Sequence, residues 1–161
     1  MNSNYIFVFA VGIGIVAGLR SLTAPAAVSW AAYLGWLSLQ GSLLALMGSI
    51  AAVATFSLLA IGELIADLLP GIPKRTAPVP LIARILMGGL CGVCLCESHL
   101  NQPPLITGAT LGAIGAVIGA FAGYEIRRRL VKGLNTKDVF IAVPEDLIAI
   151  GLALFFVSRQ L

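Results

Sequence analysis

The amino-acid sequence predicts an all-α protein, a polytopic transmembrane helix bundle of five to six short, glycine-rich segments. Hydrophobic residues make up 59% of the chain and charged residues 11%, whereas a soluble domain carries about 25% charged residues. Prolines and short polar stretches separate apolar runs close to the roughly 20 residues that a helix needs to cross a bilayer. Small residues recur at helical spacing, as in packed membrane helices. We expect residues 1–161 to form a single transmembrane domain.

The first apolar run covers residues 5–19, and no Lys or Arg precedes it. A cleaved secretory signal begins with a basic region, so we expect this run to be retained as a membrane segment. The chain is polar from Arg20 to Pro25, and Pro25 disfavours helix at Ala24, so the first stretch is predicted to break there. The second segment, 26–37, is short enough to be tilted, incomplete or re-entrant. The remaining segments are predicted at 43–69, 81–98, 105–124 and 140–158.

Two connections and one helical extension follow from composition. Ser38 to Ser42 is a short polar turn that contains Gly41. Residues 70–80 hold four prolines, too many for a helix. The basic stretch 125–137 is predicted to extend the preceding helix and then to turn.

The basic residues predict the orientation, because cytoplasmic loops of membrane proteins carry an excess of Lys and Arg. The loops 70–80 and 125–139 hold most of the basic residues, whereas Arg159 is the basic residue of the opposite side. The sequence therefore predicts a multi-pass protein of the bacterial inner (cytoplasmic) membrane with these two loops in the cytoplasm. Six segments with both termini outside is the favoured topology, and five segments with the N-terminus inside is the alternative.

One segment, 105–124, carries a regular pattern of small residues. Glycines recur four apart along it, and such a face lets another helix backbone approach closely. We expect an internal or homo-oligomeric packing face; the alternative is the smooth wall of a pore. The glycines are Gly108, Gly112, Gly115, Gly119 and Gly123.

Ionisable residues in membrane segments are costly and need partners or water. Several such residues fall in the cytoplasmic half of the predicted bundle, which makes that half the candidate polar or substrate site. Glu145 and Asp146 also suit a helix N-terminus, and Arg84 can reach toward the interface. Glu63 is either half of a structural ion pair or a site for a substrate, an ion or a proton. The candidate site residues are Arg20, Ser21, Thr23, Glu63, Asp67, Arg84, Glu125, Glu145 and Asp146.

Other functional classes find little support in the sequence. Cys91 and Cys94 share a helix face from which Cys96 points away, so no metal site is predicted beside His99. Because there is no phosphate-binding loop and no nucleophile–base set, we expect neither enzymatic activity nor a cofactor. The net charge of +3 is too small and dispersed for nucleic acid. The expected partners are the lipid bilayer and either a second copy of the chain or another membrane protein.

Two stretches of the chain resemble a known family. One is the run Gly-Leu-Arg-Ser-Leu-Thr-Ala-Pro-Ala-Ala-Val-Ser-Trp-Ala-Ala at 18–32; the other is Glu-Leu-Ile-Ala-Asp-Leu-Leu-Pro at 63–70, followed by Lys-Arg-Thr-Ala-Pro at 74–78. Together they resemble small bacterial inner-membrane proteins described as a domain of unknown function of the 4126 type. The resemblance implies a bacterial membrane protein and brings no activity. The matching positions are Arg20, Ser21, Thr23, Pro25, Glu63, Asp67, Pro70, Arg75, Thr76 and Pro78.

Two functional hypotheses follow. The first is a small transporter or channel-like protein, with Arg20, Glu63 and Asp67 lining a cavity in the cytoplasmic half. The second is a non-transporting scaffold or accessory subunit that docks a partner through its glycine-rich helix face. Transport predicts a water-accessible cavity that reaches Glu63, whereas a scaffold predicts that Glu63 is tightly paired and dry.

Overall fold

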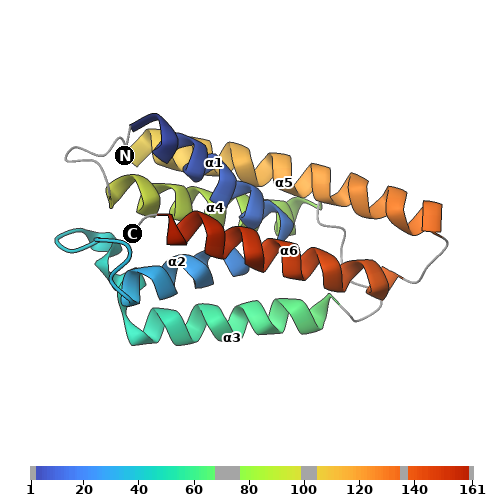
Figure 1. Cartoon of the computed structure of the whole chain (residues 1–161), viewed down its shortest axis with the longest axis horizontal. Helices are drawn as coiled ribbons and strands as arrows, with labels where there is room; N and C mark the ends of the chain where they lie inside the picture. The colour runs from blue at the N-terminus through green and yellow to red at the C-terminus, as the bar shows by residue number, and fades with distance from the viewer. Residues whose placement is uncertain (1–2, 68–76, 99–104, 135–137, 160–161) are drawn as a thin grey trace.

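The computed structural model describes residues 3–67, 77–98, 105–134 and 138–159, and all regular structure within them is helical. The all-α prediction is therefore confirmed. Figure 1 shows the helices lying roughly along one long axis. In chain order they are α1 (Ser3–Leu19), α2 (Thr23–Tyr33), the 3-10 helix η1 (Leu43–Gly48), α3 (Ile50–Ala66), α4 (Pro78–Glu97), α5 (Leu105–Leu134) and α6 (Asp138–Ser158).

Three of the described helices are long and apolar enough to cross a membrane, namely Pro78–Glu97, Leu105–Gly133 and Ile141–Ser158. Two shorter helices, Tyr5–Leu19 and Ile50–Ala66, are also apolar. This pattern confirms a polytopic helical membrane protein. The helix α2 has 11 residues and so a length of about 16 Å, well short of the roughly 30 Å of a hydrocarbon core.

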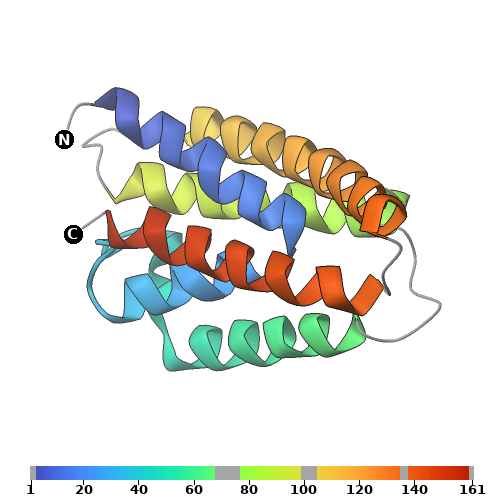
Figure 2. The ribbon, with the colours of Figure 1, turned by 45° about the vertical axis from the view of Figure 1, so that its right-hand side comes forward.

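The helices α1 and α2 form a hairpin inside the bundle. Figures 1 and 2 show α2 turning back from the end of α1 toward the end of the molecule where α1 begins and α6 finishes. We call that end the opposite end, because it lies opposite the charged end that is defined next. The other end, where α3 and α5 finish and α4 and α6 begin, we call the charged end. The turn of the hairpin points toward the charged end.

The predicted break after α1 is present, but it is shorter than the sequence suggested. Arg20 to Leu22 separate the helices, and α2 already begins at Thr23. The expectation that Pro25 disfavours helix at Ala24 was wrong, because Pro25 lies in the first turn of α2. The N–H that proline lacks has no intrahelical partner in a first turn, so proline is tolerated there.

The predicted segment 43–69 is divided into η1 and α3 by a serine. Ser49 has an extended backbone, and its side chain accepts a hydrogen bond from the N–H of Ala52 at 3.1 Å. Such an N-cap lets a new helix start. The turn before η1 is as predicted, with Gly41 at a φ of +88° that favours glycine.

The start of α4 corrects the predicted loop 70–80. The helix begins at Pro78, and Pro80 also lies in its first turn, where prolines fit for the same reason as Pro25. The basic pair Lys74 and Arg75 lies outside the described residues. The turn expected at the end of the basic stretch, at 133–135, is not present at Gly133 and Leu134, which are still helical, and Asn135 lies outside the described residues. The predicted extension of the fifth segment is one continuous helix, α5, as far as Leu134.

Glycines bring the backbones of α1, α4 and α5 together. Gly112 of α5 lies against Gly88 of α4 on one side and Gly14 of α1 on the other. A Cβ atom added to any of these three would meet a backbone carbonyl of a neighbouring helix. Close backbone contact of this kind lets small residues hold membrane helices together. The other predicted glycines lie on the same contact or are buried near it: Gly108, Gly115, Gly119 and Gly123.

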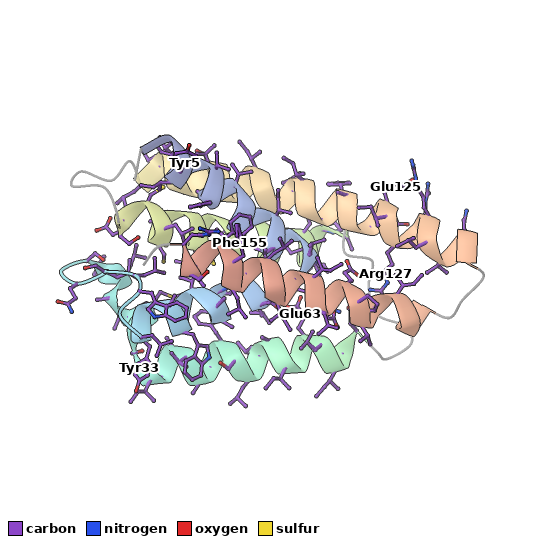
Figure 3. All side chains as sticks on the ribbon, viewed as in Figure 1. Tyr5, Tyr33, Glu63, Glu125, Arg127 and Phe155 are labelled. Atoms are coloured by element: carbon purple, nitrogen blue, oxygen red, sulfur yellow. The ribbon has the colours of Figure 1, made fainter. Side chains whose placement is uncertain are left out.

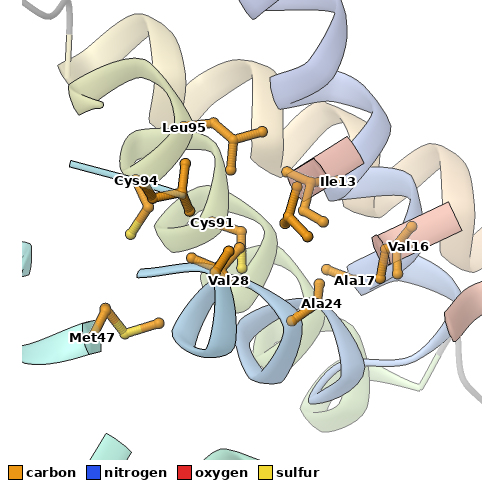
Figure 4. Close-up of a cluster of buried hydrophobic side chains, with 14 of the residues drawn as sticks. Ile13, Val16, Ala17, Ala24, Val28, Met47, Cys91, Cys94 and Leu95 are labelled. Atoms are coloured by element: carbon orange, nitrogen blue, oxygen red, sulfur yellow. The ribbon is translucent and has the colours of Figure 1, made fainter. Parts of the chain in front are cut away.

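A continuous core joins this trio to the rest of the bundle. Figure 4 shows Ile13 and Val16 of α1, Val28 of α2 and Cys91 of α4 in one buried cluster. Cys94 belongs to the same cluster, whereas Cys96 packs in a separate one with Ile6 and Ala10. All three cysteines are free thiols. Their packing is that of small, polarisable core residues.

Candidate functional site

The break between α1 and α2 leaves helix ends inside the bundle. The last carbonyls of α1 and the N–H groups of Ser21 and Leu22, just before α2, have no partners within a helix. In a membrane such groups must find partners inside the protein. Side chains from α3 and α4 supply them.

Glu63 of α3 closes the α2 side of the break. Its carboxylate accepts hydrogen bonds from Ser21 N–H at 2.9 Å, from the Ser21 hydroxyl at 2.7 Å and from Leu22 N–H at 2.9 Å. A negative charge at a helix N-terminus is favourable, because the helix dipole is positive there. The Glu63 side chain is 13% exposed.

Arg84 of α4 closes the α1 side. Its Nη1 donates to the carbonyl of Gly18 at 2.9 Å and lies 3.4 Å from that of Leu19. A positive charge suits the C-terminus of a helix. Its Nη2 lies 3.7 Å from Glu63 Oε1, so the two capping side chains also form an ion pair. The predicted pairing of an arginine with Glu63 is present, and the arginine is Arg84.

Arg20 itself is almost completely buried, with 1% of its side chain exposed. Its Nη1 lies 2.9 Å from Asp67 Oδ2 at the end of α3. Its Nε donates to Asp146 Oδ1 of α6 at 2.7 Å, and its Nη2 contacts the same oxygen. The guanidinium therefore links the α1–α2 junction to both α3 and α6.

A second arginine extends this link to α5. Arg127 Nη1 donates to Asp67 Oδ2 at 3.0 Å and lies 3.6 Å from Glu145 Oε2. Figure 3 shows Arg127 directed from α5 into the bundle. We call the five residues the charge ring. They are Arg20, Asp67, Arg127, Glu145 and Asp146.

The structure brings the predicted site residues together, with the exception of Glu125. Thr23 is buried in the first turn of α2, next to the break. Glu125 does not join the others, because it points away from the bundle, as Figure 3 shows. It pairs on the surface with Arg128 at 3.1 Å and Arg129 at 2.8 Å. Those partners lie three and four residues further along the same face of α5, where side chains meet readily.

Sequence reasoning missed Arg127, which was grouped with the basic residues that set orientation. A signal for its role was present. Gly115, Gly119 and Gly123 recur every four residues along the face of α5 that meets α1, and Arg127 is the next position in that series. The same face that packs the helix therefore carries Arg127 into the bundle.

A cavity of about 240 Å³ lies between α2, α3 and α6. Its lining is almost entirely apolar, and a hydrogen bond of 3.0 Å from Trp30 Nε1 to the Ser57 hydroxyl joins α2 to α3 beside it. Thr23 lies at one end, but Glu63 is not among the lining residues. In the part of the chain that the structure describes, no three His, Cys, Asp or Glu side chains are placed to hold a metal ion.

Comparison with known proteins identifies a family. The model of the family described as "Domain of unknown function (DUF4126)" matches residues 7–158. No curated protein and no solved structure matches the chain. The match covers the hairpin from Phe7 onward, both capping side chains and the whole charge ring. The resemblance noted at the break and at the end of α3 is thereby confirmed, and the chain belongs to the DUF4126 family.

Proposed function

We propose that this protein is a non-transporting scaffold or accessory subunit of the bacterial inner membrane, which docks a membrane partner. The observation that carries the proposal is the state of Glu63. Its carboxylate accepts three hydrogen bonds from the α1–α2 junction and faces Arg84. Through these contacts Glu63 acts as a structural cap on the α1–α2 junction.

A transport site would need a wet path to the same carboxylate. The Glu63 side chain is 13% exposed, and the apolar cavity between α2, α3 and α6 is lined without it. Buried polar networks with satisfied members rigidify a fold. The charge ring, which ties the hairpin to α3, α5 and α6, supports the same interpretation.

The docking surface differs from the one that the sequence suggested. The glycine face of α5 is occupied by α1 and α4 of the same chain, so a partner needs another surface. Of the 17 residues of α3, Val53 is the buried one. Ala51, Thr55 and Gly62 lie along the outer face of α3, and an added Cβ at Gly62 would meet nothing within 4 Å. We place the docking face on this side of α3, where a transmembrane helix of the partner can approach closely.

The proposed orientation keeps the charged end in the cytoplasm. Arg127, Arg128, Arg129 and Lys132 lie toward that end of α5, whereas Arg159 follows α6 at the opposite end. Cytoplasmic ends carry the excess of basic residues. The start of α1 and the finish of α6 at one end of the bundle agree with an even number of passes.

Transport through the same residues is the second candidate, and the interrupted hairpin favours it. Discontinuous helices whose N-termini face a charged group form the binding sites of many transporters. Here the N-terminus of α2 faces Glu63. In that case the carboxylate would have to release Ser21 and Leu22 during each cycle.

Replacement of Glu63 with glutamine separates the two candidates. We expect liposomes that contain wild-type protein or Glu63→Gln to pass H⁺, Na⁺, K⁺ and Cl⁻ no faster than protein-free liposomes. Glu125→Gln is the matched control, because that acid lies outside the network. The scaffold proposal fails if the wild type and Glu125→Gln conduct one of these ions and a folded Glu63→Gln does not.

Docking is tested with a photoreactive side chain placed at Leu58 or Gly62 on the outer face of α3, and at Ile118 on α5 as an exposed control. We expect α3 positions to give one discrete adduct with another membrane protein in native membranes, and Ile118 not to give it. The adduct must form again when the photoreactive side chain is moved to the contacting helix of the partner. Labelling of lipid alone at Leu58 and Gly62 would remove α3 as the docking face.

A further inference from the structure

The C-terminal part of α5 extends beyond what a membrane crossing requires. The helix has 30 residues and a length of about 45 Å, against about 30 Å for the hydrocarbon core. The first 20 residues, 105–124, contain no charged residue, whereas 125–134 contain five. The change of composition places the last ten residues of α5 in the headgroup layer. Figure 1 shows this part of α5 reaching past the start of α6.

The bases of this segment face in two directions. Arg127 turns inward to Asp67 and Glu145 and is 14% exposed. Arg128 and Arg129 point outward, with 52% and 78% of their side chains exposed, and Lys132 is also exposed. Three outward bases face one outward acid, Glu125, so the outer surface carries a positive excess.

An apolar stripe runs beside these bases. Ile126 and Leu130 are one helical turn apart and are 59% and 42% exposed. A helix segment with exposed apolar side chains next to exposed bases matches a membrane interface, where acyl chains and charged headgroups meet. At such an interface acyl chains cover the apolar side chains while headgroup phosphates meet the bases.

We propose that the outward face of the last ten residues of α5 binds the headgroups of anionic phospholipids. Arg128, Arg129 and Lys132 contact the lipid phosphates, while Ile126 and Leu130 lie against the upper part of the acyl chains. Each basic residue near an anionic surface contributes about a fivefold gain in affinity. The proposal does not depend on whether the protein docks a partner or transports an ion.

The test uses the full-length protein in detergent micelles, titrated with phosphatidylglycerol or with phosphatidylcholine and followed by native mass spectrometry. We expect the wild type to prefer phosphatidylglycerol. The triple variant Arg128→Gln, Arg129→Gln, Lys132→Gln should lose this preference, by about fivefold per charge and on the order of 100-fold in total. A variant that keeps the charges, with Arg128→Lys, Arg129→Lys and Lys132→Arg, should retain most of it.

Three controls make the result decisive. The single variant Arg129→Gln should give a partial loss, and it tests the proposal even where the triple variant is poorly folded. Arg159→Gln, at the opposite end, should leave the preference unchanged. Inorganic phosphate at the same concentration should not displace the lipid. The proposal is overturned if the folded triple variant still prefers phosphatidylglycerol, if Arg159→Gln removes as much of the preference, or if free phosphate competes equally.

Discussion

Replacement of Gly112 with leucine is expected to abolish the folded bundle. A Cβ at this position would overlap the carbonyl oxygen of Gly88 and lie 3.2 Å from the Cα of Gly92. The opposing atoms belong to backbones, so no side-chain rotation can relieve the overlap. Extra methylenes in a core that can adjust cost about 1–3 kcal/mol. We therefore expect Gly112→Leu to lose more than about 3 kcal/mol of unfolding free energy.

Thermal unfolding and size-exclusion chromatography of the purified variant in detergent measure this effect. Gly151→Leu in α6 is the matched control, because an added Cβ there would meet nothing within 4 Å. We expect the control to elute and unfold like the wild type. If Gly112→Leu and Gly151→Leu were equally stable, α1, α4 and α5 could not be packed through their backbones.

Arg20→Met is expected to cost about 3–5 kcal/mol of stability, the range found when one partner of a buried ion pair is removed. Methionine fills much of the space of the arginine, so the loss reports the charges. Without the guanidinium, Asp67 and Asp146 lose the ion pairs that they make with Arg20, and both carboxylates stay largely buried. Chemical or thermal unfolding in detergent gives the loss directly.

Three further variants identify the source of that loss. Arg129→Met removes an exposed pair with Glu125 and should change stability little. Arg20→Lys should restore only part of the loss, because an ammonium group cannot copy the forked contacts to Asp67 and Asp146. The triple variant Arg20→Met, Asp67→Asn, Asp146→Asn should be more stable than Arg20→Met alone. Equal losses for Arg20→Met and Arg129→Met would exclude a structural role for the ring.

Much of the fold was predictable from the sequence, because the apolar runs are long and the breaks between them polar. The errors concern helix starts. Pro25 and Pro78 were treated as helix breakers, yet both lie in first turns. Whether a proline falls in a first turn or in an interior depends on where the helix begins. At α2 that point is held by a carboxylate 41 residues away, on Glu63, which no local pattern reveals.

The members of the candidate site were largely predictable, but their pairing was not. Charges in apolar segments are expensive, so Glu63 and Arg84 stood out. Which base meets which acid depends on helix rotation and depth. Arg127 belongs to the network because it continues the glycine face of α5 that packs against α1. Glu125 does not belong to it, because it pairs with Arg128 and Arg129 on its own helix.

The caps at the hairpin also impose an order on membrane insertion. The free N–H groups of Ser21 and Leu22 are satisfied by Glu63, and the carbonyl of Gly18 by Arg84. The ribosome synthesises Glu63 more than 40 residues after the turn, and Arg84 more than 60 residues after it. Bare backbone groups are not tolerated in hydrocarbon. We therefore expect the newly made hairpin to stay at the membrane surface, or inside the insertion machinery, until α4 has been synthesised.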